Sequence, residues 1–354
     1  MKLEDLRDEI DSIDNELLKL LNSRMEVVKN VGKFKQNTKG AIYRPEREKQ
    51  IIQRLANQSD GEMSYSAIEA IFMELFAISR NLELPEKVVY LGPEGSYSHQ
   101  AARRKFGAMS SYMPLASIES VFKVLEHGEA KYGVVPIENN TDGAVGATLD
   151  SLAKYKSLIV AEEYMEIHHS FATELDDLKK IETIYSHPQG YNQCINFLDE
   201  HFLTDIEFIP TRSTSAAAAR AKHDTNSAAI CSKIAAKINN LPILFEKIED
   251  NEANRTRFLI LSNVKNQKSE FDKTSILAKL DDKTGSLVDF LQKFKNSGID
   301  LLKIESRPIK EEKFKSMFFI DFDGHIDDEN VKKFFDDKAN NLKWLGSYVN
   351  GEDR

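Results

Sequence analysis

The sequence predicts a multidomain fold in which an all-α segment is followed by an α/β segment and then by an α+β segment. Three patterns support this prediction. Apolar residues recur every three or four positions over residues 3–34, which is typical of a long helix. Strand-like runs, polar turns and helix-like runs alternate over residues 88–262, and from residue 273 the expected order is βαββαβ, that of a ferredoxin-like unit. We therefore expect domains at residues 1–84, 87–264 and 273–350.

Composition narrows the class of protein. The 354 residues carry a net charge of −9, which argues against general affinity for nucleic acid or for an anionic membrane. Two cysteines without a CxxC or metal-binding pattern favour a reduced, cytoplasmic protein with small core cysteines. The acidic, helical start is not typical of a signal peptide, and no apolar run of about 18 residues is present.

Residues 3–34 are expected to form one helix of about nine turns with a coiled-coil-like seam. Arg24 fills the seam position between Leu20 and Val27. Because a charge in an apolar seam is costly without a counter-charge, Arg24 favours an anion site. The alternative is a plain coiled coil with solvated basic side chains, and for Lys35 alone that alternative is the simpler interpretation.

Arg7, Arg24 and Lys35 share one side of this helix, but they are far apart along it. Arg7 is about 42 Å from Lys35 and about 25 Å from Arg24 at the usual helical rise. An antiparallel second copy would bring its own Arg7 back to the other two residues. The spacing therefore predicts a dimer.

Two further helices are expected in this segment. Pro45 suits the first turn of a helix over residues 45–57, which carries Arg47 and Glu48. Ser64 is a candidate cap for a third helix, and Ser79 and Glu83 border the apolar stripe of that helix, one turn apart.

In the second segment, polar residues follow the expected strands. A strand ending at Pro136 is followed by Glu138, Asn139 and Thr141, a pattern that fits a turn with a helix cap as well as it fits a binding site. Ser186 follows another strand, and Gln193 is expected on the next helix. The alternation predicts a mostly parallel sheet with ligands at the carboxyl ends of strands.

The run from Arg255 to Leu261 reads as a buried strand. Side chains alternate along a strand, so Thr256 and Phe258 should face one way and Arg255 and Arg257 the other. This places a hydroxyl at the mouth of a rigid strand, apart from the flanking charges. Taken alone, a Thr at a strand entrance is also ordinary β-structure.

The helical segment resembles the all-helical chorismate mutase domain, a three-helix unit that interlocks with its twin. By this resemblance, Lys35 and Glu83 are catalytic groups, and Glu48 takes the substrate hydroxyl. A Glu83 that faces the ether oxygen of the substrate helps only when it is protonated, so mutase activity should weaken as pH rises. The full set that the resemblance assigns to substrate is Arg7 from the partner chain, Arg24, Lys35, Arg47, Glu48, Ser79 and Glu83.

The runs VVYLGPEGSYSHQAA, GVVPIENNTDGAV, YSHPQGYNQC and NRTRFLIL resemble the prephenate dehydratase domain, in order and over its length. The resemblance implies two lobes like those of a periplasmic binding protein, with the active site between them and Thr256 as the catalytic hydroxyl. Decarboxylation and dehydration driven by aromatisation require no metal or cofactor, and none is expected. The implied substrate-binding residues are Glu138, Asn139, Thr141, Ser186, Gln193, Thr256 and Phe258.

In the last segment, two motifs resemble the ACT domain that binds L-phenylalanine in these dehydratases, usually between paired domains. The motif residues are Gly285, Ser286, Leu287, Val288, Glu305, Ser306, Arg307 and Pro308. The alternative is a merely structural dimerisation domain.

Together the three resemblances imply a homodimeric or larger enzyme of phenylalanine biosynthesis, with chorismate and prephenate as substrates and L-phenylalanine as a feedback inhibitor. Neither nucleic acid nor a membrane is expected as a partner. Two alternatives stay open: a dehydratase that prefers arogenate, and a non-catalytic protein that senses an amino acid.

Overall fold

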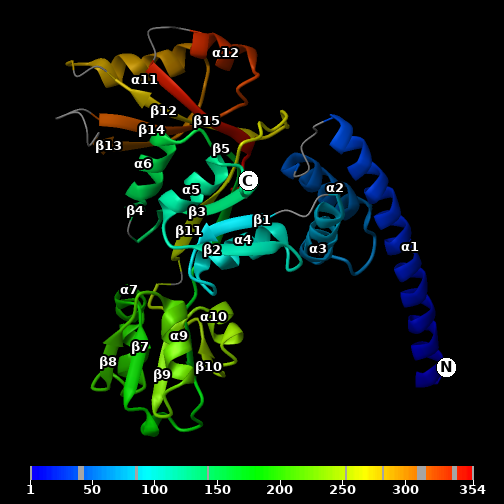
Figure 1. Cartoon of the computed structure of the whole chain (residues 1–354), viewed down its shortest axis with the longest axis vertical. Coiled ribbons are helices and arrows are strands. Elements are labelled where there is room, and N and C mark those ends of the chain that lie inside the picture. Colours follow the sequence, from blue (N-terminus) through cyan, green and yellow to red (C-terminus); the bar gives the residue numbers. More distant parts are fainter. Residues whose placement is uncertain are drawn as a thin grey trace. The chain divides into compact units, whose positions relative to one another are not determined.

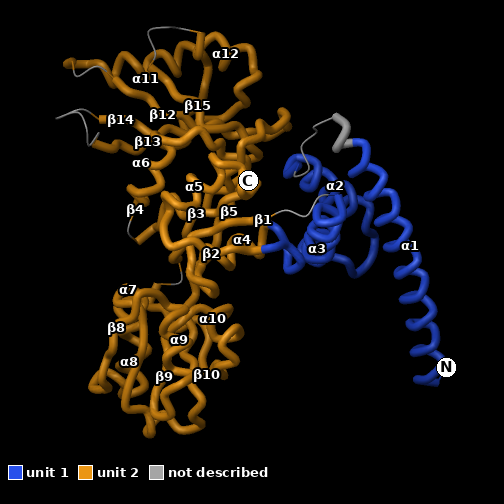
Figure 2. Tube along the Cα trace, in the orientation of Figure 1, with its two compact units in different colours: residues 1–86, 106–111 blue, residues 87–105, 112–354 orange. Residues whose placement is uncertain are grey.

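The computed structural model describes residues 2–38, 44–83, 87–141, 143–251, 253–280, 283–308, 316–336 and 341–352, with the backbone alone for residues 35–38. The chain divides into two compact units (Figure 2). Unit 1 comprises residues 1–86 and 106–111, and unit 2 comprises residues 87–105 and 112–354. Each unit has its own secondary structure. In the described part of the chain, no helix has the length and apolar character needed to cross a membrane.

Unit 1 is helical, as the apolar periodicity predicts. Its helices are α1 (Leu3–Thr38), α2 (Pro45–Gln58) and α3 (Tyr65–Glu83). Helix α1 has 36 residues, and Ser64 caps α3 by accepting a hydrogen bond from the Ala67 backbone N–H at 3.2 Å. At Gly32 a Cβ atom would lie 3.0 Å from the Cα atom of Glu83, so α1 and α3 approach closely at that point.

Helix α1 packs on α3 over part of its length, but most of its apolar seam is exposed within the single chain. Leu17, Leu20 and Val27 are 51%, 68% and 62% exposed. An exposed apolar seam of this kind is typical of an interaction surface.

Unit 2 begins with a mixed sheet in the order β2-β1-β3-β11-β5, with β4 paired to β3 (Figure 1). We call this part lobe 1. Its elements are β1 (Lys87–Leu91), α4 (Tyr97–Phe106), β2 (Ser111–Leu115), α5 (Ile118–Glu126), β3 (Tyr132–Asn139), β4 (Gly143–Ala144), α6 (Gly146–Lys154), β5 (Leu158–Glu166) and β11 (Arg255–Ser262).

Lobe 2 is a second mixed sheet in the order β10-β6-β9-β7-β8. The chain enters it after β5 through residues 167–169 and leaves it before β11 through residues 247–254. Its elements are β6 (Ser170–Thr173), a 3₁₀ turn (Leu178–Lys180), β7 (Thr183–Ser186), α7 (Pro188–Asn192), α8 (Ile195–Glu200), β8 (Glu207–Pro210), α9 (Thr214–Lys222), β9 (Ser227–Cys231), α10 (Lys233–Ile238) and β10 (Ile243–Glu246). Cys194 and Cys231 are buried here, and burial raises the pKa of Cys231 to about 12.

The expectation of a mostly parallel sheet is wrong. Strand β1 runs parallel to β3, but β11 is antiparallel to both β3 and β5 because it returns from lobe 2 into the middle of the lobe 1 sheet. Strand β3 also continues past Pro136, since Glu138 and Asn139 pair with Arg257 and Thr256 of β11. The helix expected to carry Gln193 ends one residue earlier, at Asn192.

The remainder of unit 2 has the predicted order βαββαβ and forms an antiparallel sheet, β13-β14-β12-β15, which we call the third sheet. Its elements are β12 (Asp272–Lys279), α11 (Ser286–Asn296), β13 (Leu301–Pro308), β14 (Ser316–Asp323), α12 (Glu329–Asp336) and β15 (Asn341–Val349).

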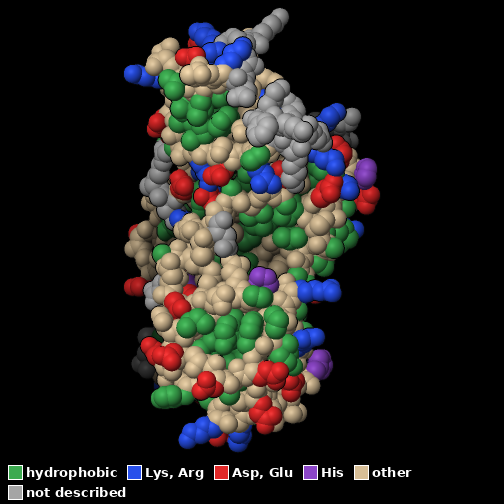
Figure 3. Space-filling model, turned by 90° about the vertical axis from the view of Figure 1, so that its left-hand side faces the viewer, with side chains coloured by type: hydrophobic (Ala, Val, Ile, Leu, Met, Phe, Trp, Pro, Cys, Tyr) green, Lys and Arg blue, Asp and Glu red, His purple; other side chains and the backbone are tan. Residues whose placement is uncertain are grey.

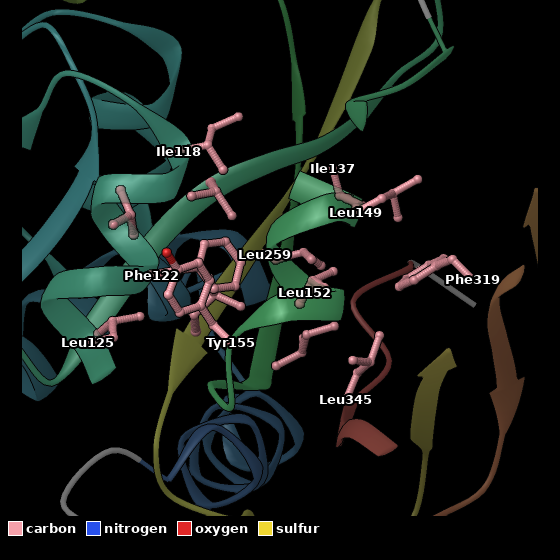
Figure 4. Close-up of a cluster of buried hydrophobic side chains, with 14 of the residues drawn as sticks. Ile118, Phe122, Leu125, Ile137, Leu149, Leu152, Tyr155, Leu259, Phe319 and Leu345 are labelled. Atoms are coloured by element: carbon pink, nitrogen blue, oxygen red, sulfur yellow. The ribbon is translucent and has the colours of Figure 1, made fainter. Parts of the chain in front are cut away.

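The core of lobe 1 is continuous with the third sheet. Leu149 and Leu152 of α6 and Leu259 of β11 belong to the same buried cluster as Phe319 and Leu345 (Figure 4). A Cβ atom at Gly346 would lie 2.1 Å from the Ile159 carbonyl oxygen, so only glycine permits this approach of β15 to β5. The third sheet therefore shares a buried cluster with lobe 1 and forms a second cluster with α11 and α12.

Candidate active sites

In unit 1, Arg24 of α1 lies against α3. Its Nη1 donates to Ser79 Oγ at 2.7 Å, and its guanidinium carbon is 5.9 Å from the centre of the Phe76 ring. Burial lowers the pKa of Arg24, and the negative charge of Glu83 acts in the opposite direction. The hydroxyl of Ser79 donates to the Leu75 carbonyl oxygen at 2.6 Å, which fixes the oxygen that Arg24 meets. Arg24, Ser79 and Glu83 thus form a polar group at the contact between α1 and α3.

Glu48 is held by a residue that sequence reasoning missed. It forms an ion pair with Arg80, and the two side chains are only 15% and 5% exposed. Arg80 gave no signal because a basic residue in the last turn of a helix is an ordinary partner of the helix C-terminus. Arg7 and Arg47 are exposed in the single chain, and the side chain of Lys35 lies outside the described residues.

In lobe 1, Thr256 and Asn139 sit opposite each other on β11 and β3. Asn139 Nδ2 donates to Thr256 Oγ1 at 2.7 Å, and Asn139 Oδ1 accepts from the Thr141 backbone N–H at 2.8 Å. Thr256 is 6% exposed, so its hydroxyl lies at a polar contact beneath the surface. Two predicted residues are therefore in direct contact, and the backbone of a third orients them.

Gln193 joins this group through a residue that was not singled out. Asn254, which precedes β11, accepts from Asn139 Nδ2 at 3.1 Å and donates to Gln193 Oε1 at 3.3 Å. Gln193 Oε1 also lies 2.9 Å from His169 Nε2. Gln193 Nε2 is buried and has no hydrogen-bond partner among the described residues, so it is a donor available to a ligand.

The other predicted dehydratase residues have different surroundings. Ser186 is fully buried and donates to the Ile230 carbonyl oxygen at 3.2 Å, whereas Thr141 is exposed. Phe258 is 2% exposed and belongs to the strand interior. Glu138 forms an ion pair with Lys303 of β13, which links the third sheet to β3.

Figure 3 shows one face of the molecule on which hydrophobic side chains gather over lobe 2, at the bottom of the view, with a hollow above them.

Asn254 could have been found from the sequence, because it opens the same run that carries Thr256. His169 had no such signal, since a histidine between two strands is common in turns. The structure places both in the segments that join the two lobes.

The third sheet carries the remaining predicted residues. Gly285 caps α11 with a φ of 89°, a left-handed conformation that favours glycine, and it precedes Ser286, Leu287 and the exposed Val288. Arg307 of β13 makes a two-pronged contact with Asp150 of α6 at 3.0 and 3.1 Å. Arg307 is thereby directed at lobe 1, and Glu305, Ser306 and Pro308 lie on the same strand.

No cluster of three or more His, Cys, Asp and Glu side chains suited to a metal ion is found in the described part of the chain.

Comparison with known proteins gives a consistent picture for both units. The family described as "Chorismate mutase type II" matches residues 6–84, and that described as "Prephenate dehydratase" matches residues 88–266. A bifunctional chorismate mutase/prephenate dehydratase of Pseudomonas aeruginosa is 39% identical over 98% of this chain and 97% of its own length. The protein of the same description from Aquifex aeolicus is 36% identical over 98% of each chain.

Among solved structures, a prephenate dehydratase of Arthrobacter aurescens in complex with L-Phe is similar to this chain with a TM-score of 0.70. The two are 30% identical, and the similarity covers 76% of this chain and 91% of the other. The chain thus belongs to the bifunctional chorismate mutase/prephenate dehydratase family, and it is an enzyme that carries one domain of each kind.

Proposed function

We propose that unit 1 rearranges chorismate to prephenate at Arg24, and that unit 2 converts prephenate to phenylpyruvate at Thr256. Both steps belong to phenylalanine biosynthesis. The observation that carries the second assignment is the 2.7 Å contact in which Asn139 donates to Thr256 Oγ1. With its oxygen engaged as an acceptor, the hydroxyl of Thr256 keeps its hydrogen for the substrate.

The mutase reaction breaks a C–O bond and forms a C–C bond within one molecule, so it requires no covalent partner. The enzyme has to hold a compact dianion and stabilise the charge that grows on the ether oxygen. Arg24 suits this task because Ser79 fixes its direction and the surrounding helices remove part of its water. A second copy would add its own Arg7 to the same site.

In the dehydratase reaction, the ring carboxylate leaves as carbon dioxide and its electron pair enters the ring. The C–O bond to the ring hydroxyl then breaks as the ring becomes aromatic. The departing hydroxide needs a hydrogen bond, which Thr256 donates, and it leaves as water with a proton from solvent. Gln193 Nε2 is a second donor for the anionic substrate.

We assign the third sheet as an ACT-type regulatory domain that binds L-phenylalanine near Gly285–Val288 and Glu305–Pro308. The βαββαβ order supports this assignment, and so does the similarity to a dehydratase solved with L-Phe. The contacts of Lys303 with Glu138 and of Arg307 with Asp150 offer routes by which ligand binding reaches lobe 1.

The deciding experiment supplies chorismate, prephenate or arogenate separately, with and without L-phenylalanine, to the wild-type chain and to Thr256→Val. The wild type should form phenylpyruvate from the first two substrates and lose activity when L-phenylalanine is added. Thr256→Val should accumulate prephenate from chorismate, since the isosteric valine keeps the fold but lacks the hydroxyl. Asn140→Ala is the control, because Asn140 is an exposed neighbour whose amide bonds only to the Ala253 carbonyl oxygen among the described contacts.

Phenylpyruvate formation by Thr256→Val at the wild-type rate would exclude Thr256 from the reaction. Faster turnover of arogenate than of prephenate would reassign the substrate, and binding of L-phenylalanine without any turnover would indicate a sensor.

A further inference from the structure

We propose that Asn254 is a positioning residue of the dehydratase reaction, because it holds the amide of Asn139 in the orientation that leaves the Thr256 hydroxyl free to donate. This inference rests on the proposed role of Thr256. Asn254 itself does not touch the substrate. It acts through Asn139, and it connects Thr256 to lobe 2.

The orientation of the Asn139 amide follows from its neighbours. Its oxygen accepts from the Thr141 backbone N–H at 2.8 Å, and an N–H group can only donate. The NH₂ group must then face Thr256 Oγ1 at 2.7 Å and Asn254 Oδ1 at 3.1 Å, which supply one acceptor for each of its two hydrogens. A flipped Asn139 would present its oxygen to Thr256 and draw the hydroxyl hydrogen away from the substrate.

Asn254 is fixed in its turn by lobe 2. Its own NH₂ group donates to Gln193 Oε1 at 3.3 Å, so its oxygen has to point at Asn139. His169 Nε2 lies 2.9 Å from the same Gln193 oxygen, and His169 Nδ1 lies 2.9 Å from the hydroxyl of Tyr97. Because Gln193 Oε1 is an acceptor, His169 carries its hydrogen on Nε2. The Nδ1 atom of His169 faces the hydroxyl of Tyr97, which also donates to the His168 carbonyl oxygen at 3.0 Å.

The two segments that join the lobes are tied together at this point. The Ile167 backbone N–H donates to the Asn254 carbonyl oxygen at 2.8 Å, and the Ile248 N–H donates to the His169 carbonyl oxygen at 3.1 Å. The carboxylate of Glu249 accepts from the His169 N–H at 2.8 Å. The Asn254 carbonyl oxygen and the joining segment before it are therefore held, and the residue is 3% exposed.

The longest hydrogen bond in this series is the 3.3 Å contact between Asn254 and Gln193. This hydrogen bond also connects the joining segment to lobe 2. Asn254 thus makes the donor state of Thr256 depend on the position of lobe 2 as well as on the sheet of lobe 1.

The test compares Asn254→Ala, Asn254→Asp, Asn140→Ala and Thr256→Val with the double variant Thr256→Val/Asn254→Ala, all in the full-length chain with prephenate as substrate. Chorismate consumption by unit 1 serves as the internal reference for active protein. Asn254→Ala should lower kcat for dehydration roughly 10- to 100-fold, the scale of a small misplacement, with little change in KM. Asn140→Ala should match the wild type, and Asn254→Asp should keep more activity than Asn254→Ala, because its carboxylate still accepts from Asn139.

The double variant separates positioning from an independent role. If Asn254 acts through Thr256, the double variant should be no slower than Thr256→Val alone, measured with enzyme in excess over substrate. A further drop equal to that seen in the wild-type background would overturn the proposal, and so would an unchanged kcat in Asn254→Ala. If Asn254→Ala does not fold, Asn254→Asp decides, and a loss as large as that of Thr256→Val would count against the proposal.

The experiment distinguishes failure of the role proposed for Thr256 from failure of the role proposed for Asn254. A fully active Thr256→Val would remove the proposed function itself. An inactive Thr256→Val together with a fully active Asn254→Ala would remove only the role of Asn254.

Discussion

Arg257 Nη1 lies 2.6 Å from Asp321 Oδ2, although the two residues belong to different sheets, β11 of lobe 1 and β14 of the third sheet. Arg257 also reaches Glu162 at 2.8 Å and the hydroxyl of Tyr348 at 2.9 Å, and Lys273 pairs with Glu162 at 2.9 Å. The four charged side chains are at most 3% exposed, and their charges balance. The residue next to Thr256 is thus the centre of a buried polar network that joins lobe 1 to the third sheet.

Removing one charged partner of this network should lower the free energy of unfolding. Asp321→Ala leaves the Arg257 charge buried without its closest counter-charge, and the loss expected for such a change is about 3–5 kcal/mol in unfolding free energy. The sole tryptophan, Trp344 of β15, provides the signal for urea unfolding. Glu329→Ala, which breaks the exposed pair with Lys333 on α12, is the matched control and should leave the midpoint unchanged. Equal midpoints for the two variants would show that the network adds no stability.

Substitutions of Arg24 and Ser79 should lower the mutase activity and leave the dehydratase activity unchanged. Arg24→Ala removes a cation from the proposed chorismate site, so kcat/KM for chorismate should fall by about 100-fold or more. Ser79→Ala should cost less, because it removes only the hydrogen bond that directs Arg24. Dehydration of prephenate by the same samples is the control. A parallel loss of both activities would point to unfolding instead.

The exposed seam of α1 predicts an active site shared between two copies. Arg7→Ala and Arg24→Ala should each lack mutase activity. When the two variants are mixed by co-refolding, half of the dimers should contain one chain of each kind, and each such dimer has one intact site out of two. The mixture should therefore regain about one quarter of wild-type mutase activity. Co-refolding Arg24→Ala with Thr256→Val, which has an intact mutase site, sets the upper reference. No recovery in the first mixture would contradict a site built from Arg7 of one copy and Arg24 of another.

Stability should fall as the pH drops below about 6.5, the ordinary value at which a histidine in the unfolded chain takes up a proton. Burial lowers the pKa of His169, and it does the same for His99 and His325, so the unfolded state binds protons first and is favoured. At His169, the negative charge of Glu249 raises the pKa, whereas the charge of the neighbouring His168 lowers it further. The measurement is the urea midpoint between about pH 7.5 and 5.5. His169→Gln should have a flatter profile, and a midpoint that rises on acidification would contradict the assigned direction.

Much of unit 1 and of the third sheet follows from local sequence. The spacing of Leu3 to Phe34 predicts α1, because apolar residues at every third or fourth position share one side of a helix. The order βαββαβ expected from residue 273 is the order of elements around the third sheet. The mixed sheets did not follow from such patterns. A run such as Arg255–Leu261 specifies a buried strand, but it carries no record of which strand it will pair with or in which direction.

In the candidate dehydratase site too, the sequence predicts individual residues but not the contacts between them. Thr256 and Gln193 stand out in the sequence through their motifs. Their connection through Asn254 does not, since Asn139 and Asn254 are separated by 115 positions and meet only because β11 returns to pair with β3.

The sequence by itself determined the family, the order of the segments, the long α1 helix and the residue types available for catalysis, because these depend on short-range patterns. Only the tertiary structure decided that Thr256 faces Asn139 and that Arg257 meets Asp321 across 64 positions. Such contacts are set by strand direction, pairing register and the packing of whole sheets, and no short stretch of sequence contains that information.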